Sequence, residues 1–126
     1  MSELRILLVE DSLADAVLTE RALEGGDGAR VELTAARTLG EGIDRLAQGF
    51  DAILLDLTLP DSLGPETVTR MRAAARELPI VVLSGSEDPA TVDLCLRAGA
   101  HAYREKGRID STDLRLILSR AIDSER

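Results

Sequence analysis

Hydrophobic positions along the chain fall into five short apolar runs, which alternate with longer segments of helical periodicity. The runs occupy residues 4–9, 30–35, 52–56, 80–84 and 102–104. The third and fourth are apolar almost throughout, which is typical of parallel strands buried on both faces. The second alternates with charged positions, which is typical of a strand at the edge of a sheet. We therefore predict five strands, with the second at the margin.

The segments between these runs carry the start and stop signals of helices, which are capping residues, proline and glycine. In chain order the signals are the stretch 13–23 before Gly25-Gly26, the capping box from Thr38 to Glu41 before Gly49, Gly64-Pro65 before Pro79, Asp88-Pro89 before Gly99, and the caps from Asp110 to Asp113. The alternation of strands and helices, with short connections and right-handed crossovers, predicts an open, doubly wound parallel sheet with helices on both sides.

Composition limits the class of protein. The chain has 126 residues, of which 44% are hydrophobic and 30% charged, and this predicts one compact domain. The N-terminus lacks a signal-peptide layout and no apolar run approaches the roughly 20 residues that cross a bilayer, so we expect a cytoplasmic protein without membrane insertion. A formal charge of −8 repels a phosphate backbone and disfavours direct nucleic-acid binding.

Rare residue types exclude several kinds of site. A single cysteine, Cys95, cannot form a disulfide within the chain or a cysteine-cluster metal site. A single histidine, His101, excludes zinc sites built on two or three imidazoles. Lys106 is the only lysine among 15 basic residues. Lysine differs from arginine because its compact, flexible ammonium can meet a single oxygen.

Chemically active residues follow four of the five predicted strands, at the edge where such sheets bind ligands. Glu10 and Asp11 follow the first strand, Asp56 ends the third, Ser84 ends the fourth and Lys106 follows the fifth. Three carboxylates close together need a cation, and an oxygen-only ligand set favours Mg²⁺. A carboxylate beside Mg²⁺ could attack an activated phosphoryl group, which would give an acyl phosphate on Asp56.

Each of these residues also has a purely structural interpretation. Glu10 and Asp11 could be acids that favour a helix N-terminus, Ser84 could belong to a serine-glycine turn, and Lys106 could lie on the surface. Asp56 is harder to explain in this way, because it ends a fully apolar strand. The joint occurrence of all five at strand ends favours the functional interpretation.

The chain resembles, over essentially its whole length, the receiver domains of two-component response regulators. The motifs that carry the resemblance are LLVEDS at 7–12, DLTLPDSLG at 56–64, VVLSG at 81–85 and GAHAYREK at 99–106. Together with the periodicity, the resemblance predicts one receiver domain over residues 1–126. Its fold class is α/β: a single doubly wound (βα)5 flavodoxin-like domain, with a five-stranded parallel sheet of order 2-1-3-4-5 and helices on both faces.

The resemblance implies a metal-dependent phosphoacceptor. Asp56 would take a phosphoryl group from a histidine kinase or a histidine phosphotransfer protein. Mg²⁺ would be held by Glu10, Asp11, Asp56 and the backbone carbonyl of Thr58. Such a domain is a signalling switch and not an enzyme with an external substrate, because it catalyses only its own phosphorylation and dephosphorylation.

The resemblance also implies a readout. Ser84 and Lys106 would bind the phosphoryl group, and Tyr103 matches the aromatic switch position that turns inward on activation. The switch would reshape the face formed by the fourth helix, fifth strand and fifth helix. That face would control a downstream protein partner, an attached output domain or a homodimer.

Three residues depart from the usual pattern of the family. Glu10 replaces the commoner aspartate and could alter the water shell of the metal. Ser84 stands where threonine is frequent and keeps the hydroxyl. Gly107 replaces the usual proline after the lysine, which leaves that loop freer.

Two further functions stay open from the sequence. One is an interaction domain that keeps the fold and docks partners without phosphorylation, which the intact set of five site residues argues against. The other is a phosphohydrolase of the haloacid dehalogenase type, which uses similar groups. That family needs a second acid two residues after the nucleophile, where this chain has Thr58.

Overall fold

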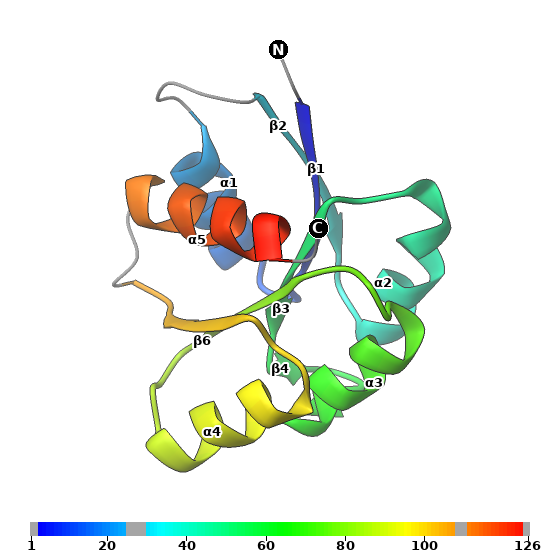
Figure 1. The fold of residues 1–126 in the computed structure, drawn as a ribbon. Coiled ribbons are helices and arrows are strands. Elements are labelled where there is room, and N and C mark those ends of the chain that lie inside the picture. Colours follow the sequence, from blue (N-terminus) through cyan, green and yellow to red (C-terminus); the bar gives the residue numbers. More distant parts are fainter. Residues whose placement is uncertain (1–2, 25–29, 108–110, 125–126) are drawn as a thin grey trace.

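Five parallel strands form the central sheet in the order β2-β1-β3-β6-β7 (Figure 1). Their bounds are β1 (Glu3–Val9), β2 (Arg30–Ala36), β3 (Ala52–Asp56), β6 (Ile80–Ser84) and β7 (Ala102–Glu105). Numbered as the five predicted strands, this is the order 2-1-3-4-5, with the charged second strand at one edge. The computed structural model describes residues 3–24, 30–107 and 111–124, and it confirms the predicted fold class.

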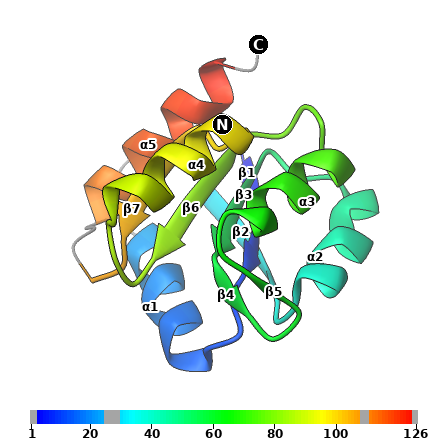
Figure 2. The ribbon, with the colours of Figure 1, turned by 90° about the horizontal axis from the view of Figure 1, so that it is seen from below.

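Helices cover both faces of this sheet, as Figures 1 and 2 show. Their bounds are α1 (Leu13–Leu23), α2 (Leu39–Arg45), α3 (Glu66–Ala74), α4 (Pro89–Ala98) and α5 (Ser111–Ser124). α1 and α5 pack on one face, while α2, α3 and α4 pack on the other. Among the described helices, none is long and apolar enough to cross a membrane.

The strands divide their side chains between two hydrophobic cores. In β1, Leu7 and Val9 belong to the core under α2, α3 and α4, while Ile6 and Leu8 belong to the core under α1 and α5. This division follows from the two-residue period of a strand. All five residues of β3 are buried, which matches the run predicted for a strand covered on both faces.

The predicted helix signals act as caps in the structure. The side chains of Ser12, Thr38 and Asp88 accept hydrogen bonds from the backbone three residues on, at the starts of α1, α2 and α4. The second helix is shorter than predicted, because α2 gives way to a 3-10 turn, η1 (Leu46–Gln48), before Gly49. The signals at Gly25-Gly26 and Asp110 lie outside the described residues.

A small hairpin that the sequence analysis did not predict follows β3. It consists of β4 (Thr58–Leu59) and β5 (Ser62–Leu63), which pair antiparallel. Between them, the Asp61 carboxylate accepts hydrogen bonds from the backbone N–H groups of Leu39 (2.8 Å) and Gly40 (2.9 Å) at the start of α2. These bonds lower the pKa of Asp61, since they favour the charged carboxylate. The hairpin is thereby fixed to α2.

Arg72 joins the ends of two helices on one face of the sheet. Its guanidinium donates hydrogen bonds to the carbonyls of Ala75 (2.8 Å), Leu78 (2.7 Å) and Gly99 (2.7 Å). The first two carbonyls follow α3, and the third follows α4. One planar side chain therefore satisfies backbone acceptors from both helix ends.

We expect Arg72→Met to lower the free energy of unfolding by about 2 kcal/mol, because it removes charge-assisted bonds to several carbonyls. Arg97→Met is the matched control, because Arg97 forms an exposed ion pair with Asp93. Its loss should change stability by less than about 0.5 kcal/mol. Urea unfolding measures both variants. Equal losses for the two would contradict the role given to Arg72.

Candidate functional site

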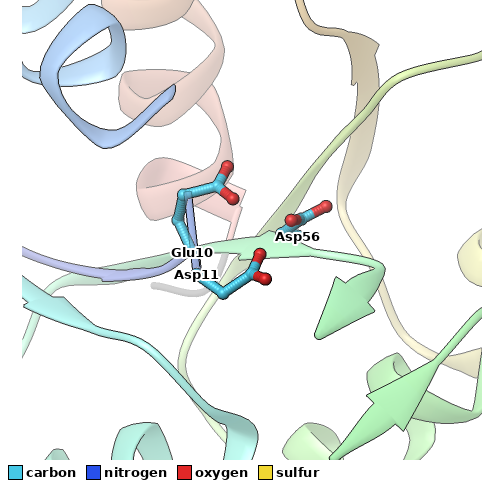
Figure 3. Close-up of side chains that lie close together, drawn as sticks. All are labelled: Glu10, Asp11 and Asp56. Atoms are coloured by element: carbon cyan, nitrogen blue, oxygen red, sulfur yellow. The ribbon is translucent and has the colours of Figure 1, made fainter. Parts of the chain in front are cut away.

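Three carboxylates meet at the carboxyl edge of the central strands. Oxygens of Glu10, Asp11 and Asp56 all lie within 4.8 Å of one another (Figure 3). Glu10 and Asp11 directly follow β1, and Asp56 ends the neighbouring β3. The backbone N–H of Glu10 donates to the Ala36 carbonyl at 2.8 Å, which extends the pairing of β1 and β2 to the site. The topology therefore brings Asp56 beside the adjacent pair Glu10 and Asp11, from which it is distant in the sequence.

Two of the three carboxylates are withdrawn from solvent. Glu10 is 3% exposed and Asp56 5% exposed, while Asp11 is half-buried. Burial raises the pKa of Glu10 to about 7, and the neighbouring Asp56 adds to this rise, whereas Lys106 opposes it. Buried like charges at such separation need a cation. The ligand set contains only oxygens and suits Mg²⁺.

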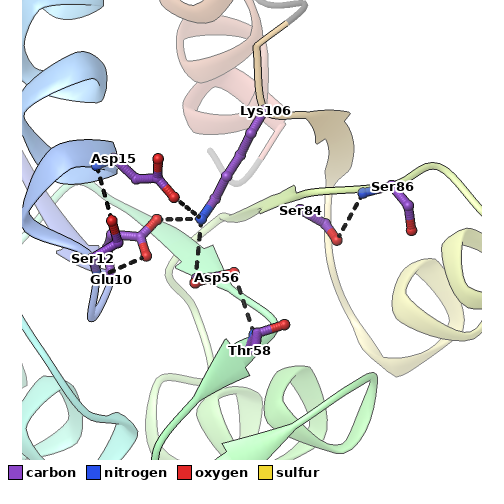
Figure 4. A network of polar contacts seen from close by, with 8 residues as sticks. All are labelled: Glu10, Ser12, Asp15, Asp56, Thr58, Ser84, Ser86 and Lys106. Carbon is purple, nitrogen blue, oxygen red and sulfur yellow. Dashed lines mark hydrogen bonds and ion pairs between the residues drawn. The ribbon is translucent and has the colours of Figure 1, made fainter.

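Lys106 supplies positive charge at the centre of the site. Its Nζ lies 2.5 Å from a Glu10 oxygen, 3.1 Å from an Asp15 oxygen and 3.3 Å from an Asp56 oxygen (Figure 4). Its backbone N–H donates to the Ser84 carbonyl at 2.7 Å, which fixes the start of the lysine arm beside β6. Burial acts to lower the pKa of Lys106, but the three carboxylates together raise it, so the ammonium is charged.

The sequence analysis did not identify Asp15. It lies in the first turn of α1, where an acid is explained by its favourable interaction with the helix dipole. Its spacing from Asp11 gives no signal, because Asp11 precedes the capping Ser12 and lies outside the helix. The partner, Lys106, is 91 residues away, and no local pattern points to it.

Thr58, Ser84 and Tyr103 are the remaining predicted residues. The Thr58 backbone N–H donates to Asp56 Oδ1 at 3.2 Å, so this residue adjoins the site through its amide. The Ser84 hydroxyl accepts a long hydrogen bond, 3.5 Å, from the backbone N–H of Ser86. This hydrogen bond lies within the turn that follows β6 (Figure 4), and the Ser84 side chain also interacts with the Tyr103 side chain. Ser84 ends β6 at the same edge of the sheet as the carboxylates, and its role in binding a phosphoryl group stays a prediction.

Tyr103 is turned inward. Its side chain is 5% exposed, and its hydroxyl donates to the Ser86 carbonyl at 2.7 Å. Burial raises the pKa of Tyr103, so the phenol stays protonated and able to donate. The Ser86 turn therefore connects Tyr103 with Ser84, at the end of β6.

Comparison with known proteins identifies the family. A sequence model of the response regulator receiver domain matches residues 6–119. The chain belongs to this family. The receiver domain is 36% identical over 104 residues to the swarming motility regulation protein RssB of Serratia marcescens. The match covers 82% of the chain and 46% of RssB, so the chain spans less than half the length of that relative.

Solved structures agree with this assignment. A CheY-like receiver domain protein from Methanospirillum hungatei has a TM-score of 0.79 and 30% identity, with 98% of this chain and 97% of that one covered. The receiver domain of the sensor histidine kinase PA1611 from Pseudomonas aeruginosa has a TM-score of 0.79 and 27% identity, with 97% and 99% covered. That structure is described with a magnesium ion coordinated in the active site cleft.

Gly107 has a backbone conformation that explains its departure from the family pattern. Its φ of +83° lies in the left-handed region, whereas proline is locked near about −65°. We expect Gly107→Ala to lower the free energy of unfolding by about 1 kcal/mol, and Gly107→Pro by more. Gly85→Ala is the control, because it lacks a positive φ and has open space for a Cβ. A stable Gly107→Pro variant in urea unfolding would contradict this explanation.

The raised pKa of Glu10 predicts a pH-dependent stability without metal. The group has a folded pKa of about 7, above its usual 4.5. Its stabilising effect is therefore complete below about pH 4.5 and lost as the pH rises through 7. In EDTA, the free energy of unfolding of the wild type should fall relative to that of Glu10→Gln between pH 5 and 8. Parallel pH profiles of the two proteins in urea would refute this prediction.

Proposed function

We propose that this receiver domain, over residues 1–126, is a Mg²⁺-dependent phosphoacceptor switch of a two-component system. Asp56 takes a phosphoryl group from the phosphohistidine of a histidine kinase or a histidine phosphotransfer protein. The observation that carries the proposal is the buried Asp56 carboxylate, which lies 3.3 Å from the Lys106 ammonium and within 4.8 Å of Glu10 and Asp11. This arrangement places a carboxylate nucleophile, Asp56, beside an ammonium and two further carboxylates. The ammonium, and a metal held by the carboxylates, could balance the negative charge of a phosphoryl group.

Glu10, Asp11 and Asp56 would hold the metal, with the backbone carbonyl of Thr58 as a further ligand. Three carboxylates against one lysine leave an excess of negative charge in a partly buried site, which supports a divalent cation. When bound, Mg²⁺ neutralises charge on the phosphoryl oxygens.

In the transfer step, an Asp56 oxygen forms a bond to phosphorus while the phosphorus–nitrogen bond of the phosphohistidine breaks. The electron pair returns to the imidazole nitrogen, which takes a proton from water. Lys106 donates to one phosphoryl oxygen. In dephosphorylation, which is a separate step, water attacks phosphorus, the bond to Asp56 breaks with its electron pair returning to the Asp56 carboxylate, and inorganic phosphate leaves. The domain thus catalyses only its own phosphorylation and dephosphorylation, and these reactions serve signalling.

Ser84 connects this chemistry to the surface. Its hydroxyl accepts a hydrogen bond from the Ser86 N–H, so a shift of the hydroxyl toward a phosphoryl oxygen would move the Ser86 turn as well. The Ser86 carbonyl holds Tyr103, so this rearrangement reaches the face formed by α4, β7 and α5. That face would control a protein partner, an attached output domain or a homodimer. The charge of −8 argues against direct nucleic-acid binding, and the family supports a cytoplasmic location.

The test is incubation with acetyl phosphate and Mg²⁺, followed by mass spectrometry. We expect a mass increase of one phosphoryl group in the wild type and none in Asp56→Asn. EDTA should also abolish the increase, because the carboxylates would then repel the donor. Asp51→Asn is the matched control, since Asp51 accepts a hydrogen bond from the Arg5 backbone at the opposite end of β3. It should retain phosphorylation.

Two results would count against the proposal. If no acyl phosphate forms, or if it forms equally in Asp56→Asn, phosphotransfer to Asp56 is excluded. In the first case a Mg²⁺ affinity near zero, measured by calorimetry, would favour a docking domain that works without phosphorylation.

A further inference from the structure

Asp15 is a fourth carboxylate at the site, in addition to the three candidate metal ligands. It belongs to the first turn of α1, and its backbone N–H donates to the capping Ser12 hydroxyl at 3.2 Å. Its side chain is 41% exposed, whereas the Glu10 and Asp56 side chains are buried. Asp15 therefore stands at the rim of the site, on a backbone that the helix cap holds in place.

The contacts of Lys106 are unequal among its three acidic partners. An ammonium has three N–H donors, and here three carboxylates surround it. The separations are 2.5 Å to Glu10 and 3.1 Å to Asp15, but 3.3 Å to Asp56 (Figure 4). Glu10 and Asp15 both lie on the segment that runs from β1 into α1. Two of the three described carboxylate partners of the ammonium therefore lie on this segment, and the third, Asp56, lies on β3.

Among the three described carboxylate partners of Lys106, Asp15 is the one to which the proposed chemistry gives no role in binding the metal or carrying the phosphoryl group. Asp56 would carry the phosphoryl group, and Glu10 would share its carboxylate with the metal. The phosphoryl group brings a charge of about −1.5 to −2 and three acceptor oxygens. The Lys106 ammonium must then donate a hydrogen bond to a phosphoryl oxygen, while the Asp15 carboxylate still competes for that ammonium.

We propose that Asp15 is a positioning residue that draws Lys106 toward α1 and so competes with a phosphoryl group on Asp56. This inference rests on the proposed function. In the resting domain, Asp15 holds the ammonium by an ion pair at the rim of the site. When the phosphoryl group arrives, Lys106 exchanges this partner for a phosphoryl oxygen, and the domain must overcome the lost ion pair to reach its phosphorylated state.

The surroundings leave room for this exchange. Asp15 and Lys106 both line a cavity of about 500 Å³, together with apolar side chains of α1, β6 and α5. The lysine stem is fixed at its base by the hydrogen bond from its backbone to the Ser84 carbonyl. Its flexible methylene chain can therefore swing at the tip without repacking either core.

A purely structural role for Asp15 makes a different prediction. An acid in the first turn interacts favourably with the helix dipole, and removing its charge would lower stability without changing anion binding. Glu20 provides the matched control, because it is an exposed acid on the same helix and is not among the described partners of Lys106. Glu20→Gln removes the same charge from α1 but leaves the Asp15–Lys106 pair intact.

The experiment is a titration with beryllofluoride, a phosphoryl mimic, at saturating Mg²⁺. Lys106 is the only lysine, so protein labelled with ¹³C,¹⁵N-lysine gives one set of lysine signals. We expect Asp15→Asn to bind beryllofluoride roughly three- to five-fold more tightly, as expected for an ion pair of up to about 1 kcal/mol. Asp15→Glu should restore the wild-type affinity, and Glu20→Gln should keep it.

The lysine signals separate the outcomes. Without beryllofluoride, they should shift in Asp15→Asn; with it, the wild type and Asp15→Asn should converge. Unchanged or weaker binding in Asp15→Asn, or equal tightening in Glu20→Gln, would overturn the role of Asp15 while the proposed function stands. If the wild type itself neither binds beryllofluoride nor shifts its lysine signals, the proposed function fails, and the role of Asp15 fails with it. Thermal unfolding of each variant verifies that it is folded.

Discussion

The repulsion among carboxylates at the ends of β1 and β3 is the constraint that the site of this domain has to satisfy. Parallel strands expose their carboxyl ends at one edge, so a fold that places β1 beside β3 must bring Glu10, Asp11 and Asp56 together. Two of these acids are almost fully buried, and the pKa of Glu10 rises to about 7 as a result. The surrounding structure balances part of this charge with the Lys106 ammonium, and the three carboxylates are a group that could hold a metal ion.

Lys106 balances the negative charge of these carboxylates in a way that arginine could not. Its three donors diverge from a single nitrogen, so one compact charge meets oxygens of Glu10, Asp15 and Asp56 at once. A planar guanidinium would direct its donors as a fork and favour one bidentate partner. This explains why the single lysine of an arginine-rich chain stands at this position. It also makes the lysine position adjustable, because no single partner determines it.

The sequence predicted those parts of the fold that burial on both faces determines. The strands 52–56 and 80–84 have the predicted bounds, because every position in these runs is apolar or directly at the site. The edge strand β7 extends one residue beyond its predicted end at Arg104, since an edge strand has a weaker apolar pattern. The hairpin of β4 and β5 was missed because two-residue strands have no periodicity to detect.

The site was predictable only to the level of strand ends. Topology alone places Glu10, Asp11, Asp56 and Lys106 at one edge, and they meet there. Topology does not determine the direction in which a side chain points. The Ser84 hydroxyl turns to a backbone donor two residues away, which a residue pattern does not reveal. Asp15 was missed for the complementary reason, because its local role in a helix start conceals a contact with a distant lysine.

The magnitudes of these contacts determine what kind of switch the domain can be. The Tyr103 hydrogen bond to Ser86 has a net worth of about 1 kcal/mol, which alone shifts a two-state equilibrium only about five-fold. A nearly complete shift between two states needs about 5.5 kcal/mol. In the proposed switch, Ser84, Tyr103 and the partners of Lys106 would therefore have to change together. The Ser84–Lys106 backbone bond is suited to such coupling, because it ties the serine turn to the base of the lysine arm. Several weak contacts that change together, and not one strong contact, then set the free-energy difference between the two states.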